Sequence, residues 1–520
     1  MSRHSIGRAA GIVGFFTLLS RIAGLLRDMV MAYAFPKVQT DMFTVAFTIP
    51  NVLRYLLAEG SLSISFIPVY TEYRRKDPAQ AEEFVQTAFS VTAIVVAGIT
   101  ALGIFAAPLL VTAFAGGFAH DASKFAATVE LTRILFPYIF FISLMALAMG
   151  VLNTLGHFAT PALSPMVWNL VCVAAGLSAP VLATLCNLPP IHVFAWAVVF
   201  GGFLQFAIQL PPMRTRKVRL GFRPQFRHPG VVKMGKLMLP AVFGLAVYQL
   251  NVMLSRLFAS FLETGALSSL YYSQRLVEFP MGIFAVAIAT ASMPSLSAHA
   301  TDGEIEKMKD TLRNSLEMTF FVIIPSAVAL FLLARPIVTV LFQKGHFGHE
   351  MTALTARALA AFTLGIPSAG LVRNLVPAFY ANSESRIPVL AAATSLVSYM
   401  VLGPFLAWQW GVGGLAVAIS LCSWVNAIVL VRNFTKHFGN IGIQRSLPSL
   451  IRMLIAAAIM GAIAWAIALL GHWETGGTMR NWSVLGAAGF VGIGVYAIVG
   501  LLLGLPQPRQ LLNRFQHRNT

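Results

Sequence analysis

The chain has 520 residues, of which 57% are hydrophobic and only 11% are charged, and its formal net charge is +18. Soluble domains are nearer a quarter charged, and the apolar residues here are spread along the whole chain, so the composition excludes a soluble protein with a single anchor. The three cysteines, Cys172, Cys186 and Cys422, lie in or at the ends of apolar runs and indicate no disulfide framework.

Fourteen apolar segments are each long enough to cross a membrane as a helix, which takes about 20 residues. They are continuous runs, unlike the alternating ten-residue strands of a membrane β-barrel. The predicted fold is therefore an all-α polytopic membrane protein with 14 transmembrane helices. The predicted spans are 7–33, 40–72, 84–115, 126–152, 161–185, 191–211, 234–262, 267–298, 312–341, 352–380, 387–408, 412–432, 448–471 and 482–505.

The basic residues of the loops predict the orientation of these spans. Most of the 37 lysines and arginines fall in loops on one side, including the eight of segment 213–236, and such loops are cytoplasmic. An even number of spans places both termini there. The N-terminal segment has charges and no clear cleavage site, so we interpret it as a retained helix rather than a signal peptide. The basic residues are too scattered to favour nucleic-acid binding.

Three stretches of the first half recur in the second half at nearly one spacing, 226–228 residues. "APLLVTAFAGGF" (107–118), for example, matches "RPIVTVLFQKGHF" (335–347). The proline pairs that define the spacing are Pro68 with Pro294, Pro108 with Pro336 and Pro161 with Pro388. Because each repeat holds six spans, the two lobes should have the same orientation and be related by an axis along the membrane normal.

The repeat and the charge pattern together predict the domain limits. Residues 1–212 form an N-terminal lobe with the first six spans, and 213–236 form a basic cytoplasmic linker. Residues 237–436 form a C-terminal lobe with the next six spans. Residues 437–520 hold two further spans and a cytoplasmic tail.

Charged residues occur inside or at the edges of several spans, where each costs about 2.5–3.5 kcal/mol. The cations are Arg21, Arg27, Arg54, Arg256, Arg275 and Arg373, and the acids are Asp28, Asp41, Glu59 and Glu278. Glu278 is placed to pair with Arg275 at i,i+3, and Asp28 shares a helix face with Arg21.

The cations outnumber the local acids. We therefore predict that the surplus arginines face a central cavity and bind an anion, because the planar guanidinium matches phosphate oxygens and stays charged when desolvated. Two alternatives stay open: internal salt bridges, and, for Arg256 and Arg373, anchors at span ends. The sequence has no Walker loop and no HExxH motif, so we predict a transporter, without enzyme activity, metal or cofactor.

Four stretches of the chain resemble the MurJ/MviN lipid II flippases of the multidrug/oligosaccharidyl-lipid/polysaccharide exporter superfamily, and the similarity covers essentially the whole chain. They are "SRIAGLLRD" (20–28), "TDMFTVAFTIPNVLRYLLAEGSLSISFIPVYTEY" (40–73), "LNTLGHFATPALSPMVWN" (152–169) and "YYSQRLVEFPMGIFAVAIATASMPSLS" (271–297). The resemblance implies two six-helix lobes around a cationic cavity. It also implies two extra helices, 448–471 and 482–505, that form a groove for a polyprenyl tail.

The resemblance further implies an activity: alternating access that carries lipid II, undecaprenyl-diphosphate-disaccharide-pentapeptide, from the inner to the outer leaflet of the bacterial plasma membrane. Matched by motif, the substrate-binding residues are Arg21, Arg27, Arg54 and Arg275, and the supporting charges are Asp28, Asp41, Glu59, Glu278 and Arg373. The expected partners are lipid II, membrane lipids and the cell-wall synthesis machinery.

Two departures from the family bear on the mechanism. Gln274 stands where some relatives carry an acid, which weakens local neutralisation of Arg275. Some relatives bind sodium through aspartates of the seventh and eleventh helices, but 234–262 and 387–432 contain no acidic residue. We therefore expect drive by membrane potential or protons. The alternative functions are a flippase for another undecaprenyl-diphosphate-linked oligosaccharide, a multidrug exporter of the superfamily and a non-transporting scaffold.

Overall fold

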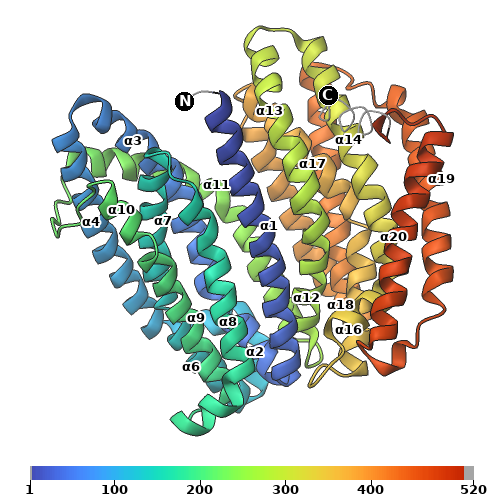
Figure 1. The fold of residues 1–520 in the computed structure, drawn as a ribbon, viewed down its shortest axis with the longest axis horizontal. Coiled ribbons are helices and arrows are strands. Elements are labelled where there is room, and N and C mark those ends of the chain that lie inside the picture. Colours follow the sequence, from blue (N-terminus) through green and yellow to red (C-terminus); the bar gives the residue numbers. More distant parts are fainter. Residues whose placement is uncertain (1–2, 509–520) are drawn as a thin grey trace. The chain divides into compact units, whose positions relative to one another are not determined.

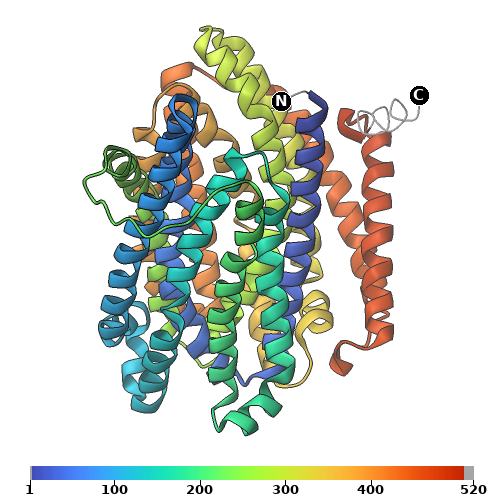
Figure 2. The same cartoon turned by 60° about the vertical axis from the view of Figure 1, so that its left-hand side comes forward.

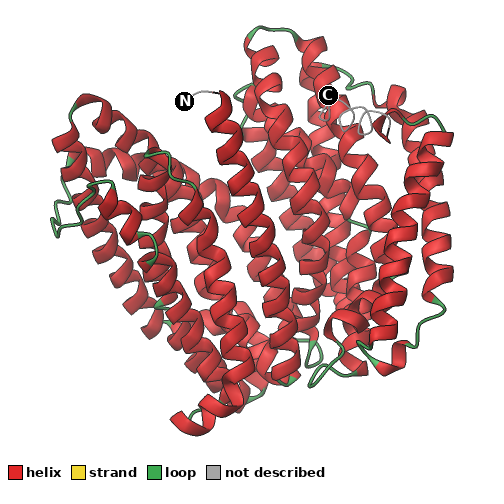
Figure 3. Cartoon of the chain, viewed as in Figure 1, coloured by secondary structure: helices red, strands yellow, loops and turns green. Residues whose placement is uncertain are grey.

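The computed structural model describes residues 3–508, without the side chains of residues 3–10, 12, 58–60, 241, 243, 283, 284 and 443. Within that range the chain is built from helices and loops, with no strand (Figure 3). It divides into two compact units, Met1–Leu267 and Ser268–Thr520. This division assigns the seventh apolar helix to the first unit, whereas the domain limits from the repeat pattern place that helix in the C-terminal lobe; those limits stay a prediction.

Unit 1 begins with a long helix, α1, that packs against α8, while α8 packs against α9 (Figure 1). One of its core clusters lies among α3, α4, α7 and α11 and includes Phe66, Phe84, Leu147 and Val231. The elements are α1 (Arg3–Ala34), α2 (Lys37–Arg54), the π-helix η1 (Tyr55–Leu62), α3 (Ser63–Lys76), α4 (Pro78–Phe105), α5 (Ala107–Ala115), the 3-10 helix η2 (Gly116–His120), α6 (Ala122–Leu135), α7 (Tyr138–Thr154), α8 (Ala159–Cys186), α9 (Pro190–Ala207), α10 (Leu210–Thr215) and α11 (Pro229–Ser260).

In unit 2, α14 contacts α13, α16, α17 and α19. The last two helices, α19 and α20, pack against each other as a hairpin beside α14 (Figure 2). Tyr496 of α20 donates a hydrogen bond of 2.9 Å to the carbonyl of Phe321 in α14. The elements are α12 (Ala266–Pro280), the π-helix η3 (Met281–Ala285), α13 (Val286–Thr301), α14 (Ile305–Leu332), α15 (Ala334–Phe342), α16 (His349–Thr363), α17 (Ile366–Ala381), α18 (Arg386–Phe438), α19 (Ile443–Ala468), η4 (Trp473–Thr475) and α20 (Met479–Leu502).

Local sequence signals set several helix ends. The Asp77 side chain accepts a hydrogen bond of 2.8 Å from the Ala79 amide at the start of α4, and Asp121 does the same for the Lys124 amide, at 3.0 Å, at the start of α6. These bonds satisfy amides that have no partner inside the helix. Gly411 interrupts α18 with φ 57° and ψ −135°, a conformation that glycine adopts readily, and it separates the two spans predicted there.

The order of elements repeats at the spacing that the sequence predicted. Helices α4 and α14 both have 28 residues and begin 227 positions apart, at Pro78 and Ile305. Helices α5 and α15 both have nine residues and begin at Ala107 and Ala334, again 227 apart. The two π-helices begin 226 apart, at Tyr55 and at residue 281. The duplication seen in three short motifs therefore extends to the backbone.

Each of the fourteen predicted spans falls on one or more helices, but the structure does not confirm fourteen separate crossings. Among the described residues, eight helices are long and apolar enough to cross a membrane, or up to ten if each of two bent helix pairs counts as one span. The helix Arg386–Phe438 is counted once there although it holds two predicted spans. The described residues therefore form an all-helical fold with eight to ten helices, or bent helix pairs, that are long and apolar enough to cross a membrane.

Candidate functional site

A buried ion pair lies in the C-terminal half of α1. Arg27 Nη2 and Nε lie 2.7 and 3.1 Å from Asp28 Oδ1, and the two side chains are only 7% and 2% exposed. Adjacent residues of a helix point to different faces, so the pair depends on the long arginine side chain reaching around the helix. From the sequence, Asp28 was expected to share a helix face with Arg21, and its pairing with Arg27 was not predicted.

Helix α8 supplies further contacts of the Arg27 guanidinium. Nη1 donates a hydrogen bond of 3.1 Å to Asn169 Oδ1, and Asn169 Nδ2 donates to the Ser20 carbonyl at 3.1 Å. The Trp168 ring centroid lies 4.8 Å from Arg27 Cζ, and the indole donates to the Val198 carbonyl at 3.1 Å. A carboxylate, an amide and an aromatic face thus compensate for removing this cation from water.

The sequence analysis did not identify Asn169 or Trp168 as site residues, although both end the quoted stretch 152–169. The available signal was an asparagine inside the apolar span 161–185, because polar groups in such spans usually have a partner. Which partner it has depends on the packing of α1 against α8.

Asp41 is buried on α2 and attaches the connection between α11 and α12 to that helix. Its Oδ2 accepts a hydrogen bond of 2.6 Å from the Gly265 amide. The Lys124 ammonium of α6 lies 3.8 Å from the same oxygen and 4.0 Å from the Phe118 ring centroid. Asp41, predicted as a supporting charge, therefore links α2 to α6 and to the connection after α11.

Arg54 is the last residue of α2 and directly precedes the π-helix η1. Its Nε donates a hydrogen bond of 2.8 Å to Asn51 Oδ1, and its Cζ lies 4.5 Å from the Tyr55 ring centroid. Arg54 is half-buried, as is Arg21 on α1. Single π-helical turns occur frequently at functional sites. The Glu59 side chain, another predicted charge, lies outside the described residues.

Arg275 is in a much more open environment on α12 of unit 2. Its Nη1 lies 3.4 Å from Glu278 Oε2, and the side chains are 42% and 43% exposed, which confirms the predicted i,i+3 pair. Its Nε lies 3.4 Å from Tyr271 Oη, and its Cζ lies 5.4 Å from the Tyr271 ring centroid. These contacts are long for a charged hydrogen bond, and the side chain is partly accessible to solvent.

The two remaining intramembrane arginines differ in burial. Arg256, in α11, is 7% exposed. Arg373, in α17, is exposed. Among the described residues, no three histidine, cysteine, aspartate or glutamate side chains are grouped as a metal site would require.

The chain matches the family model described as lipid II flippase MurJ over residues 31–482. A protein of Vibrio cholerae serotype O1 described as a probable lipid II flippase MurJ is 34% identical over 506 residues, which cover 95% of each chain. A Burkholderia cenocepacia protein described as lipid II flippase MurJ is 38% identical over 477 residues, 90% of this chain and 89% of the relative.

Solved structures show a similar fold. A structure of lipid II flippase MurJ in an inward closed conformation matches with a TM-score of 0.77 and 24% identity, covering 96% of this chain and 99% of that one. An inward-facing multidrug-resistance MATE transporter of the MOP superfamily matches with a TM-score of 0.67 and 14% identity, over 81% of this chain and 95% of that one. At these identities the likeness establishes the fold alone.

Proposed function

The chain belongs to the MurJ family of lipid II flippases, and we propose that it moves lipid II from the inner to the outer leaflet of the bacterial plasma membrane by alternating access. It is a transporter rather than an enzyme. The observation that carries the proposal is the surplus of arginines within apolar helices, in the stretches that resemble the family. An arginine suits the diphosphate of the lipid because its guanidinium offers paired donors to phosphate oxygens.

The finer architecture is part of the proposal. Fourteen spans place both termini in the cytoplasm, with two six-helix lobes in the same orientation and two further helices for the polyprenyl tail. The repeat of element lengths at 226–227 residues supports this arrangement. Transport is driven by membrane potential or protons, since moving one charge through 100 mV supplies about 2.3 kcal/mol. The cell-wall synthesis machinery is a further partner.

Arg27 and Arg275 have different tasks in this proposal. Three of the five N–H donors of Arg27 are committed to Asp28 and Asn169, so a phosphate that binds there has to share this guanidinium with its protein partners. The Arg275 side chain is 42% exposed, so its guanidinium can be reached by the diphosphate. We propose that Arg275 makes a direct contact with the diphosphate, and that Arg21, Arg27 and Arg54 complete the binding of the anion.

The test is lipid II exposure on the outer leaflet in cells that are depleted of their own flippase and carry this protein or a variant. We expect wild type to restore exposure and Arg275→Ala to abolish it, with both inserted equally well. Arg432→Ala is the matched control, because Arg432 is exposed at the end of α18 and has no task in the proposal. It should behave as wild type.

The remaining outcomes distinguish the alternatives. A well-inserted wild type that restores no exposure would redirect the proposal to another undecaprenyl-diphosphate-linked oligosaccharide. Full activity of Arg275→Ala would remove this residue from the path of the anion. The multidrug exporter is less favoured, because cationic drugs require acidic or aromatic surroundings and the surplus charge inside these helices is basic.

A further inference from the structure

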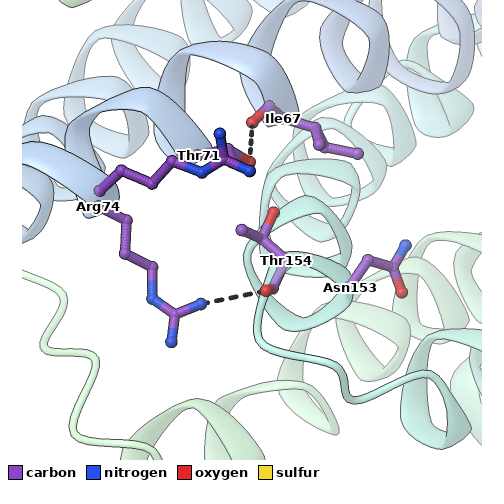
Figure 4. A pocket seen from close by; sticks show the side chains of 6 residues that line it. Ile67, Thr71, Arg74, Asn153 and Thr154 are labelled. Atoms are coloured by element: carbon purple, nitrogen blue, oxygen red, sulfur yellow. Dashed lines mark hydrogen bonds between the residues drawn. The ribbon is translucent and has the colours of Figure 1, made fainter. Parts of the chain in front are cut away.

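A separate cationic pocket lies in unit 1 where α3 and α7 end. Its volume is about 440 Å³, and its lining residues are Ile67, Thr71, Arg74, Arg75, Asn153 and Thr154. Figure 4 shows the Arg74 guanidinium turned towards the last turn of α7, where Nη1 donates a hydrogen bond of 3.1 Å to the Thr154 carbonyl. This bond holds Arg74 over the pocket, and the other donors of its guanidinium stay accessible.

The pocket offers nitrogen donors and few competing acceptors. The Thr71 hydroxyl donates to the Ile67 carbonyl at 2.7 Å, and the Thr154 hydroxyl donates to the Gly150 carbonyl at 2.8 Å. Both hydroxyl protons are thus committed to the helices. The donors left for a ligand belong to two guanidiniums and to the Asn153 amide. Paired guanidiniums favour a ligand with several anionic oxygens, which a phosphate has.

The acids beside the pocket are neutralised by other groups. Glu72 Oε1 lies 2.8 Å from the Lys76 ammonium, and its Oε2 lies 2.5 Å from the Lys233 ammonium of α11. Asp77 accepts the Ala79 amide as the cap of α4. With two lysines on one glutamate, the charges of Arg74 and Arg75 are not cancelled by Glu72.

The level of the pocket along the membrane-spanning helices indicates where its ligand comes from. Thr154 is the last residue of the apolar span Ala122–Thr154, so the pocket opens at the level where hydrocarbon gives way to headgroups. Ile67 gives it an apolar wall, while both arginines are exposed. An apolar wall below a cationic rim matches a phosphate that is attached to a lipid better than it matches a freely dissolved ion.

We infer that this pocket binds a phosphate group, supplied by the headgroup of an anionic phospholipid, with Arg74 and Arg75 as its cationic ligands. The site is independent of the intramembrane arginines. Basic groups at a membrane surface attract anionic lipid by about 1 kcal/mol each. Loss of both should weaken binding roughly 30-fold, at about 1.4 kcal/mol per tenfold.

The test uses the purified full-length protein and native mass spectrometry with phosphatidylglycerol as the probe and phosphatidylethanolamine as the neutral reference. We expect selective retention of phosphatidylglycerol by wild type and its loss in R74Q/R75Q. R223Q/R227Q is the matched control, because it removes two exposed charges from segment 213–236, which do not line this pocket. R74K/R75K keeps the charge and should keep most of the binding.

Each result supports or overturns the inference. Retention that is insensitive to inorganic phosphate supports a lipid headgroup, whereas displacement by millimolar phosphate assigns the same site to the dissolved ion. Equal retention by R74Q/R75Q and wild type overturns the site, and so does an equal loss in R223Q/R227Q, since binding would then follow overall charge. Thermal unfolding of each variant checks that the fold is intact.

Discussion

Arg27 and Arg275 are arginines of apolar helices in the two units of the chain, and their surroundings are opposite. Arg27 is 7% exposed and is bound by a carboxylate at 2.7 Å, an amide and an indole ring. Arg275 is 42% exposed, with a carboxylate at 3.4 Å. Burial makes an unpaired charge expensive, so the first arrangement stabilises the fold. The second contributes little to stability and leaves the guanidinium accessible to a ligand.

The strongest test of this comparison removes the acidic partner of each arginine. Asp28→Ala leaves the Arg27 charge buried without its carboxylate, and we expect a loss of about 3–5 kcal/mol in the free energy of unfolding. Glu278→Ala, the matched change at Arg275, should cost at most about 1 kcal/mol because that pair is exposed. Unfolding of the purified proteins in detergent measures both.

A compensating variant shows whether the charge itself causes the loss. Arg27→Gln combined with Asp28→Asn removes both charges, so we expect it to recover much of the stability lost in Asp28→Ala. Similar stability of Asp28→Ala and Glu278→Ala would contradict the distinction between the two arginines.

The hydrogen bond from α8 to Arg27 should contribute less to the free energy of unfolding than the Asp28 carboxylate does. Asn169→Ala removes the 3.1 Å hydrogen bond to Arg27 Nη1 and leaves a buried donor unsatisfied, which costs about 1–3 kcal/mol. Asn433→Ala is the control, since the Asn433 amide bonds at 2.8 Å to Val429 within its own helix. An equal loss of stability in both variants, in the same unfolding assay, would show that Asn169 has no special role at Arg27.

High salt should weaken the Arg275–Glu278 pair but not the buried Arg27–Asp28 pair. The Debye length is about 3 Å at 1 M ionic strength, so the effect of Glu278→Ala, at most about 1 kcal/mol at low salt, should disappear there. The effect of Asp28→Ala should persist because its pair is buried. The measurement is the unfolding of both variants at low and high salt. Equal sensitivity to salt would mean that water reaches both pairs.

Of the ion pairs compared here, those of Glu304 should contribute least to the free energy of unfolding, because Glu304 is accessible to solvent and lies outside the spans. Hydrogen bonds from Lys307 at 2.7 Å and His299 at 2.9 Å hold the pKa of Glu304 below its ordinary value. Its contribution is therefore present above the unfolded pKa, about 4.3, and is lost as pH falls through the lower folded pKa.

Glu304→Gln should therefore lower the stability slightly at pH 7, where the contribution is present, and its difference from wild type should vanish as the pH falls below about 4.3. The unfolding midpoint as a function of pH measures this. Glu384→Gln is the control, since Glu384 lies in the loop after α17 and takes no part in these hydrogen bonds. If both variants follow the wild-type profile, the Glu304 contacts do not contribute to stability.

Much of the architecture follows from local sequence. Long apolar runs fix the helices because a lipid-exposed backbone must satisfy its own hydrogen bonds, and the proline spacing predicted the repeated element lengths. The i,i+3 pair of Arg275 with Glu278 was also predictable, because one helical turn brings the two residues together. The number of membrane crossings does not follow from the apolar runs in the same way, since the single helix Arg386–Phe438 contains two predicted spans.

The helical membrane fold, the internal repeat and the positions of the charged residues were predictable from the amino-acid sequence, because these depend on residues close in the chain or on a repeated pattern. Packing decided which distant polar groups join each buried charge. Asn169 lies 142 positions from Arg27, and Gly265 lies 224 positions from Asp41. Such partners meet only when their elements pack, and no local pattern encodes which polar groups will then share a buried space.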